Sequence, residues 1–246
     1  MGNILVLGAS GDVGRGITAA LLQRGHVVVA VARRLDRLRA LSGDHGAPPT
    51  LHYLSGTLAD DASAAQLLLD VQRLVPRIDG VVISVNASRE LVPLLDNTST
   101  EFAARIALDL VTHFTAARHF VPAITQGGVY LGIGGGSADF ILEHGAHMSI
   151  AQAGLRMMYR GLAFELREKR IDIRELIIAS VVNGANTREY ADPLWVTDAE
   201  IGDYVAEIFA NPAAFPGPIL RMARRDATGH PVFSVEAATR VQGLRS

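Results

Sequence analysis

The chain has 246 residues, 49% of them hydrophobic, and a formal net charge of −2 at pH 7. This predicts one globular domain, residues 1–246, and excludes a disordered chain, a strongly basic nucleic-acid binder and, because cysteine is absent, disulfide or thiolate chemistry. No apolar run reaches membrane-spanning length and no signal-peptide pattern opens the chain, so we expect a cytoplasmic protein without a membrane or nucleic-acid partner.

Predicted strands and helices alternate along the chain. Short apolar runs are typical of buried strands, and longer runs with a period of 3.6 residues are typical of helices. The predicted strands are 3–7, 27–31, 51–54, 80–85, 129–133, 176–182 and 218–222. The predicted helices are 13–22, 35–41, 61–74, 100–124, 148–168 and 198–209. This order predicts an α/β fold with a doubly wound parallel sheet of about seven strands and helices on both faces, in three α/β/α layers.

Two segments interrupt this order. Residues 183–196 are polar, and we expect them to form a substrate lid over the carboxyl ends of the strands, where such sheets bind ligands. Residues 223–246 follow the last predicted strand as a C-terminal tail. The sequence leaves open whether this tail packs on the domain or contacts a partner.

The first predicted strand runs into a turn that contains Gly8, Gly11 and Gly14. In a Rossmann-type dinucleotide site such glycines allow a sharp turn, leave backbone room for a pyrophosphate and let the next helix pack closely on the sheet. The N–H groups and the positive end of the helix dipole then face the phosphates. A purely structural turn is the alternative. The turn residues predicted to bind cofactor are Gly8, Ser10, Gly11, Asp12, Val13 and Gly14.

Three stretches resemble the short-chain dehydrogenase/reductase family, with a likeness from Asn3 to about Met222. They are the glycine loop, the strand that ends in Asn86-Ala87-Ser88, and the helix pattern through Ala153, Ala163 and Glu165. The resemblance implies an oxidoreductase that binds a nicotinamide cofactor. It adds Asn86, Ala87 and Ser88 to the cofactor-binding residues.

The end of the second predicted strand bears on the choice of cofactor. An acidic side chain there would accept hydrogen bonds from a ribose 2′-hydroxyl, whereas an arginine pairs with a 2′-phosphate. The chain has Ala32 in the acidic slot, followed by Arg33 and Arg34. This favours NADP(H) over NAD(H). The alternative is that the two arginines only start a solvated helix.

The residues that the family uses for catalysis are missing. The resemblance implies a tyrosine, a lysine one helical turn later, a serine and an asparagine. Aligned positions in this chain are Met148, Gln152, Gly134 or Gly135, and Asp109. No Tyr-xxx-Lys pair exists in any register, because the only lysine, Lys169, follows Glu165 by four residues. Gln152 can still hydrogen-bond a ribose hydroxyl.

His144 and His147 are the candidate replacements for the proton donor. They precede the predicted active-site helix, and histidine titrates near neutrality. The alternative is that both are loop or interface histidines. With Glu143 they form a ligand set too poor for a metal site, so we expect no metal.

Three functions remain open. The first is an NADP(H)-dependent oxidoreductase on a small organic substrate with a non-standard proton donor. The second is a non-redox enzyme on the same scaffold, such as a cyclase, dehydratase or isomerase. The third is a catalytically inactive nucleotide-binding sensor or subunit. Helices 100–124 and 148–168 resemble the pair through which the family dimerises, and their broad apolar surfaces predict a homodimer or homotetramer.

Overall fold

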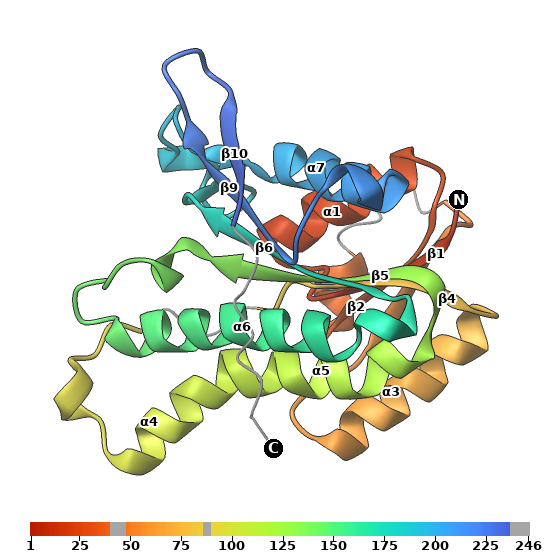
Figure 1. The fold of residues 1–246 in the computed structure, drawn as a ribbon, viewed down its shortest axis with the longest axis horizontal. Coiled ribbons are helices and arrows are strands. Elements are labelled where there is room, and N and C mark those ends of the chain that lie inside the picture. Colours follow the sequence, from red (N-terminus) through yellow and green to blue (C-terminus); the bar gives the residue numbers. More distant parts are fainter. Residues whose placement is uncertain (40–47, 86–89, 237–246) are drawn as a thin grey trace, which may run out of the picture.

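Eight strands form the central sheet of the computed structural model, which describes residues 1–39, 48–85 and 90–236 (Figure 1). The strand order is β10-β9-β6-β5-β4-β1-β2-β3. All neighbours pair in parallel except β10, which is antiparallel to β9. The strands are β1 (Asn3–Leu7), β2 (Val27–Ala32), β3 (Leu51–Ser55), β4 (Ile78–Ile83), β5 (Ile124–Gly135), β6 (Asp172–Ala179), β9 (Ile219–Arg225) and β10 (Pro231–Val235).

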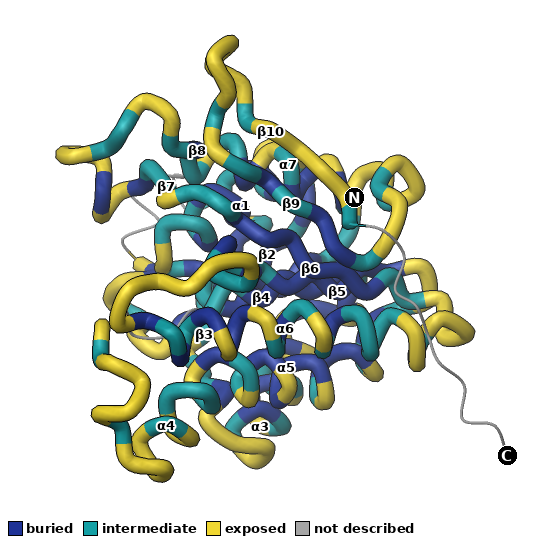
Figure 2. Tube along the Cα trace, turned by 60° about the vertical axis from the view of Figure 1, so that its left-hand side comes forward, coloured by how far each residue is buried: buried dark blue, intermediate teal, exposed yellow. Residues whose placement is uncertain are grey.

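Helices cover both faces of the sheet and complete the predicted three layers. They are α1 (Asp12–Gln23), α3 (Asp61–Leu74), α4 (Ser99–Ile106), α5 (Thr112–Phe120), α6 (Ala146–Glu165) and α7 (Asp198–Ala210), and residues 35–39 are also helical. Figure 2 shows buried residues concentrated along the central strands and on the helix sides that face them. The prediction of a doubly wound Rossmann-type α/β fold is therefore confirmed.

The helices α1 and α7 pack with almost no space between their backbones. A Cβ on Gly16 would overlap the carbonyl oxygen of Asp198, and one on Gly202 would overlap the carbonyl oxygen of Gly16. These two glycines hold α1 at a fixed distance from its neighbour. The N-terminus of α1, which follows the glycine turn, is fixed with it.

Beyond shifts of a few residues at strand ends, the structure adds three features to the predicted elements. The predicted tail contributes the eighth strand, β10, after β9 has continued to Arg225. The predicted helix 100–124 contains a π-helical segment, Ala107–Val111, and β5 begins at Ile124. The predicted lid contains two short strands that pair in parallel, β7 (Val182–Asn183) and β8 (Val196–Thr197).

The parallel strands end at one edge of the sheet, on the left of Figure 1. The chain runs from β1 outward to β3 and then returns to β4 on the other side of β1. The loop after β1 therefore lies at the switch point, where sheets of this type bind ligands. In the described part of the chain, no helix is long and apolar enough to cross a membrane.

Candidate functional site

The glycine turn after β1 has the conformation that the sequence predicts. Gly8 has a φ of 89°, in the left-handed region that favours glycine, and a Cβ there would overlap the carbonyl oxygen of Ser84. A Cβ on Gly14 would overlap the carbonyl oxygen of Gly8. The fold alone therefore explains both glycines. Gly14 brings the helix close to the turn itself rather than to the face of the sheet.

Gly11 has a different environment. It is exposed, its φ is −79°, and a Cβ there would meet only the carbonyl oxygen of Gly8, at an ordinary 3.7 Å. It is the N-cap of α1, with no side-chain hydrogen bond at the cap. Packing within the described chain does not demand a glycine here. An anion placed over the first turn of α1 would demand one.

Asp12 connects the glycine turn to the predicted lid. Its carboxylate accepts hydrogen bonds from the backbone N–H of Asn186 at 3.2 Å and from Asn186 Nδ2 at 2.8 Å. Gly184 lies so close to Asp12 that a Cβ would overlap it. The segment 182–197 thus contacts the N-terminus of α1, at the same edge as the turn.

The two arginines after β2 differ in their contacts. Arg34 is ion-paired with Asp36, at 2.5 Å, and both side chains are exposed. Arg33 is exposed and has no ion-pair partner among the described residues. Arg15, which the sequence reasoning missed, folds back over the turn, with its Nε 3.4 Å from the carbonyl oxygen of Ser10. Arg15 lies one turn into α1, on the side of the loop, and this position in the sequence could have identified it as a candidate cation for the cofactor.

Gln152, the residue in the lysine slot, is held by the end of β5. Its side chain is buried, and its Oε1 accepts a hydrogen bond from the backbone N–H of Gly135 at 2.6 Å. This contact directs the amide oxygen toward the backbone and leaves the Nε2 hydrogens as the donors that a ligand can use. The predicted residues Asn86, Ala87 and Ser88 lie outside the described residues.

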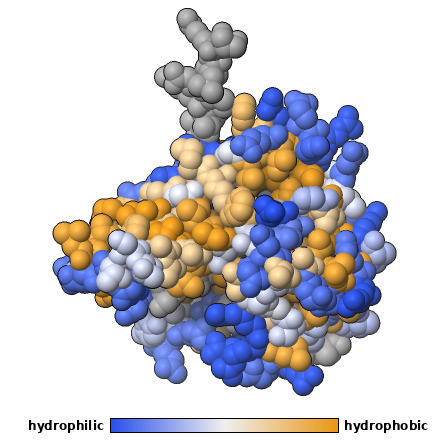
Figure 3. Space-filling view, turned by 90° about the horizontal axis from the view of Figure 1, so that it is seen from below, coloured by the Kyte–Doolittle hydropathy of each residue, from blue (hydrophilic) through white to orange (hydrophobic). Residues whose placement is uncertain are grey.

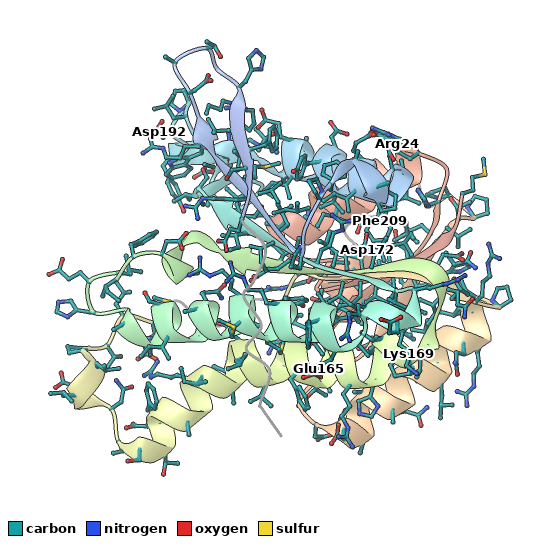
Figure 4. All side chains as sticks on the ribbon, in the orientation of Figure 1. Arg24, Glu165, Lys169, Asp172, Asp192 and Phe209 are labelled. Atoms are coloured by element: carbon teal, nitrogen blue, oxygen red, sulfur yellow. The ribbon has the colours of Figure 1, made fainter. Side chains whose placement is uncertain are left out.

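Lys169 and two of the tyrosines lie away from the glycine turn or deep in the core. Figure 4 labels Lys169 near Glu165 at the C-terminal end of α6, the end of the molecule opposite the glycine turn. Tyr130 and Tyr159 are fully buried, and burial raises the pKa of both phenols. They belong to the core beneath α6.

Tyr159 lies in a buried chain of hydrogen bonds. Its hydroxyl is 3.0 Å from His113 Nδ1, and His113 Nε2 is 3.1 Å from the carbonyl oxygen of Val85. Burial lowers the pKa of His113 to about 4, so the ring is neutral at pH 7. Because the carbonyl can only accept, Nε2 carries the proton, Nδ1 accepts, and the Tyr159 hydroxyl donates. This chain fixes the end of β4 next to the site.

Asp109 and His147 belong to two elements that pack against each other, the π-helical segment and α6. Asp109, in the asparagine slot, is 2% exposed within the π-helical segment, and His147, on α6, is 3% exposed. Burial lowers the pKa of His147, and Arg105 lowers it further, while Asp109 and Glu90 act to raise it. Among the described residues, its buried Nδ1 has no hydrogen-bond partner. At pH 7 the lowered pKa keeps this ring neutral.

His144 lies apart from this pair. It occupies the loop before α6 with a φ of 55°, and its half-exposed ring is 3.7 Å from the exposed carboxylate of Glu143. Met148, in the tyrosine slot, lies in the first turn of α6, and a Cβ on Gly145 would overlap its Cε. No group of three or more residues that could hold a metal ion occurs in the described part of the chain.

Comparison with known proteins places these features in a family. A family model described as enoyl-(acyl carrier protein) reductase matches residues 8–193. The 3-oxoacyl-[acyl-carrier-protein] reductase of Bos taurus is 21% identical over 206 residues, which are 81% of this chain and 83% of that protein.

Solved structures share the fold at low identity. A short-chain oxidoreductase from Pseudomonas aeruginosa PAO1, described as containing an atypical catalytic center, matches with a TM-score of 0.78 and 17% identity over 89% of this chain and 94% of its own. An NADPH-bound structure of a short-chain oxidoreductase with the same description matches with a TM-score of 0.74 and 18% identity, over 86% and 90% of the two chains. With the family match over residues 8–193, the chain belongs to the short-chain dehydrogenase/reductase family of oxidoreductases.

Proposed function

We propose that this protein is an NADP(H)-dependent oxidoreductase that acts on a small organic substrate without the Tyr-xxx-Lys pair. The observation that supports it best is Gly11. It is a glycine that packing does not explain, located where a pyrophosphate would lie against the N-terminus of α1. The NADPH-bound relative with an atypical catalytic center supports the same cofactor here.

The residues present fit such a group. The N–H groups at the start of α1 would face the pyrophosphate, and Gln152 Nε2 would donate to a ribose hydroxyl. Arg33 would pair with the 2′-phosphate, with Arg15 as the second cation at the turn. When bound, the cofactor supplies or accepts the hydride, so the chain has to bind, orient and exclude water.

In this proposal His147 accepts and donates the proton, and the nearby charge of Asp109 supports it. The neutral ring with an unpartnered nitrogen can take a proton from an alcohol, and the Asp109 carboxylate would stabilise the resulting imidazolium. A substrate such as an imine, an iminium or a conjugated double bond would demand less of a proton donor than a ketone does.

The 2′-phosphate assignment predicts a selective loss. Arg33→Ala combined with Arg34→Ala should weaken NADPH binding about tenfold or more, because a charge-assisted contact is lost, while NADH binding changes little. Arg33→Ala alone should account for most of the loss, since Arg34 is engaged by Asp36. Calorimetric titration of each variant with both nucleotides measures this. Equal losses for NADPH and NADH would refute the assignment.

The role of His147 predicts an acid limb in the pH profile. Alcohol oxidation should fall as the pH drops through the lowered pKa of His147, since protonation removes the base. His147→Gln should lower kcat by about 100-fold and abolish this limb. His144→Gln serves as the comparison, and we expect it to keep the wild-type profile. A loss in His144→Gln with an unaffected His147→Gln would assign the role to His144.

We also propose that the chain forms a homodimer or homotetramer through α5 and α6. Members of the family are often oligomeric, and large apolar side chains are exposed on α5, α6 and the π-helical segment before α5: Leu108, Val111, Phe114, Ile150, Met157 and Phe164. Figure 3 shows broad apolar areas on this side of the molecule. Met157→Arg should convert the oligomer to monomer in light scattering. Leu69→Arg, on the exposed side of α3, is the control. An unchanged mass for Met157→Arg would contradict this interface.

A nucleotide-binding protein without catalysis is the second candidate. The observation that favours it is the combination of Met148 and Gly135 in the tyrosine and serine slots, because the methionine thioether has no proton to donate and glycine has no side chain. Tight NADPH binding without turnover of carbonyl, imine or enone substrates would select it. Binding of neither nucleotide would exclude both candidates and favour a non-redox enzyme.

A further inference from the structure

A buried carboxyl group, Glu175, lies beneath the candidate site and has no role in the function proposed so far. It belongs to β6, opposite Gly132 of β5, and its side chain projects to the α6 side of the sheet with Ile173 and Ile177. It is 1% exposed. A glutamate among core isoleucines costs free energy unless something compensates for it or uses it.

The carboxyl group of Glu175 fills space that β5 leaves empty. A Cβ on Gly134 would overlap Glu175 Oε1, and it would be 3.4 Å from Oε1 of Gln152. The position of this Cβ is thus adjacent to the side chains of both Glu175 and Gln152. Gly135, the next residue, donates its backbone N–H to the same Gln152 oxygen. Glu175, Gln152 and the end of β5 therefore form one cluster.

Charged residues surround this cluster, but they are engaged with one another. Arg156 of α6 is ion-paired with Asp139 and with Glu236, at 3.0 Å for the latter. Arg160 of α6 is ion-paired with Glu236. Arg221 of β9 is ion-paired with Asp139. Each of these three arginines therefore pairs with a carboxylate other than that of Glu175.

Glu175 itself has no ion-pair partner within the described residues, and its Oε2 is buried without a hydrogen bond. Tyr159 of α6 also faces it, and the hydroxyl of that residue interacts with His113. Burial raises the pKa of Glu175 to about 8, with Arg156 and Arg160 opposing the rise and Glu236 and Asp139 adding to it. At pH 7 the group is a neutral acid that carries an O–H donor.

We propose that Glu175 is a positioning residue for Gln152, whose amide oxygen accepts one hydrogen bond from Gly135 and a second from the carboxyl O–H of Glu175. Both lone pairs of that oxygen are then used, and the amide cannot flip. The two Nε2 hydrogens stay directed at the ligand. This inference rests on the proposed function, because the ligand of Gln152 is the nicotinamide nucleotide.

Ionisation of Glu175 would reverse this arrangement. A carboxylate beside the amide oxygen would place two acceptors together and repel it. The buried Nε of Arg160, which also has no partner among the described residues, offers the carboxylate another contact. Nucleotide binding should therefore weaken as the pH rises through the pKa of Glu175.

Calorimetric titration with NADPH between pH 7 and pH 9 tests the proposal, since the 2′-phosphate of NADPH, with a second pKa of about 6, is already mostly dianionic at pH 7. Wild-type affinity should fall about tenfold, because the protonated fraction of a group with a pKa of about 8 falls by that factor. Glu175→Gln, which keeps a permanent N–H donor, should bind as the wild type does at pH 7 and show no fall. Glu175→Leu should bind weakly at both pH values.

Glu207→Gln is the control, since it neutralises a carboxylate that pairs with Arg24, away from this cluster, and it should keep the fall. A Glu175→Gln variant that retains the wild-type fall would overturn the proposal. Infrared spectroscopy gives a readout without nucleotide: the carbonyl band of a protonated carboxylic acid should be present at pH 7 and absent in Glu175→Gln. If this band is found but NADPH binds at no pH, the proposed function fails while the protonation of Glu175 stands. A missing band also overturns the inference.

Discussion

Gly11→Ala is expected to leave the free energy of unfolding within about 0.5 kcal/mol of wild type and to weaken NADPH binding at least about tenfold. The φ of −79° suits alanine, and the added methyl group meets only an ordinary contact within the chain. The same methyl group would stand in the space that a pyrophosphate needs. Urea denaturation and calorimetric titration of the same preparation measure the two effects.

Gly14→Ala is the matched variant in the same turn. Its Cβ would overlap the carbonyl oxygen of Gly8, so we expect a loss of roughly 3 kcal/mol in the free energy of unfolding. The two variants separate a glycine that the fold requires from one that a ligand requires. Unchanged NADPH affinity in Gly11→Ala would mean that the turn is structural only.

Glu175→Gln should stabilise the protein, by an amount that grows with pH. Burial holds the folded pKa at about 8, well above the ordinary value of 4.5. Between these values the folded state binds a proton that the unfolded state has released, so wild-type stability falls as the pH rises. The slope of a single group is about 1.4 kcal/mol per pH unit, and the variant lacks it.

Urea denaturation from pH 5 to pH 8 should therefore show the variant ahead by about 1 kcal/mol at pH 5 and by roughly 4 kcal/mol at pH 8. His113 has the opposite effect in acid, because its folded pKa of about 4 removes stability as the pH falls below 6.5, but it contributes equally to both proteins. A constant difference across the pH range would show that Glu175 is ionised in the folded state throughout.

Local patterns predicted the fold well. Short apolar runs located the seven parallel strands, and the glycine spacing located the turn at the switch point. The eighth strand escaped prediction because its apolar run is short and interrupted: Ser234 separates Val235 from Val232 and Phe233. The π-helical segment escaped because its apolar spacing barely differs from that of an α-helix.

The site was harder to predict, because its features depend on contacts distant in sequence. Arg174 and Glu175 give the first half of β6 a polar sequence, so the predicted strand began only at residue 176, although both side chains are buried. Glu175 is accommodated by Gly134 of the next strand, and Arg174 by the carbonyl oxygens of Pro212 and Phe215. The glycines that alternate along β5, Gly132 and Gly134, were the only signal for space on that face. Likewise, nothing local distinguished buried His147 from exposed His144.

Titration of the wild-type protein with NADPH and with NADH tests the central claim most directly. The exposed Gly11 and Arg33, which has no ion-pair partner among the described residues, predict saturable binding of NADPH, at least about tenfold tighter than NADH at pH 7.5 and weakened by salt. Equal affinity for the two nucleotides would contradict the assignment of NADP(H). Binding of neither would contradict the whole account of the site.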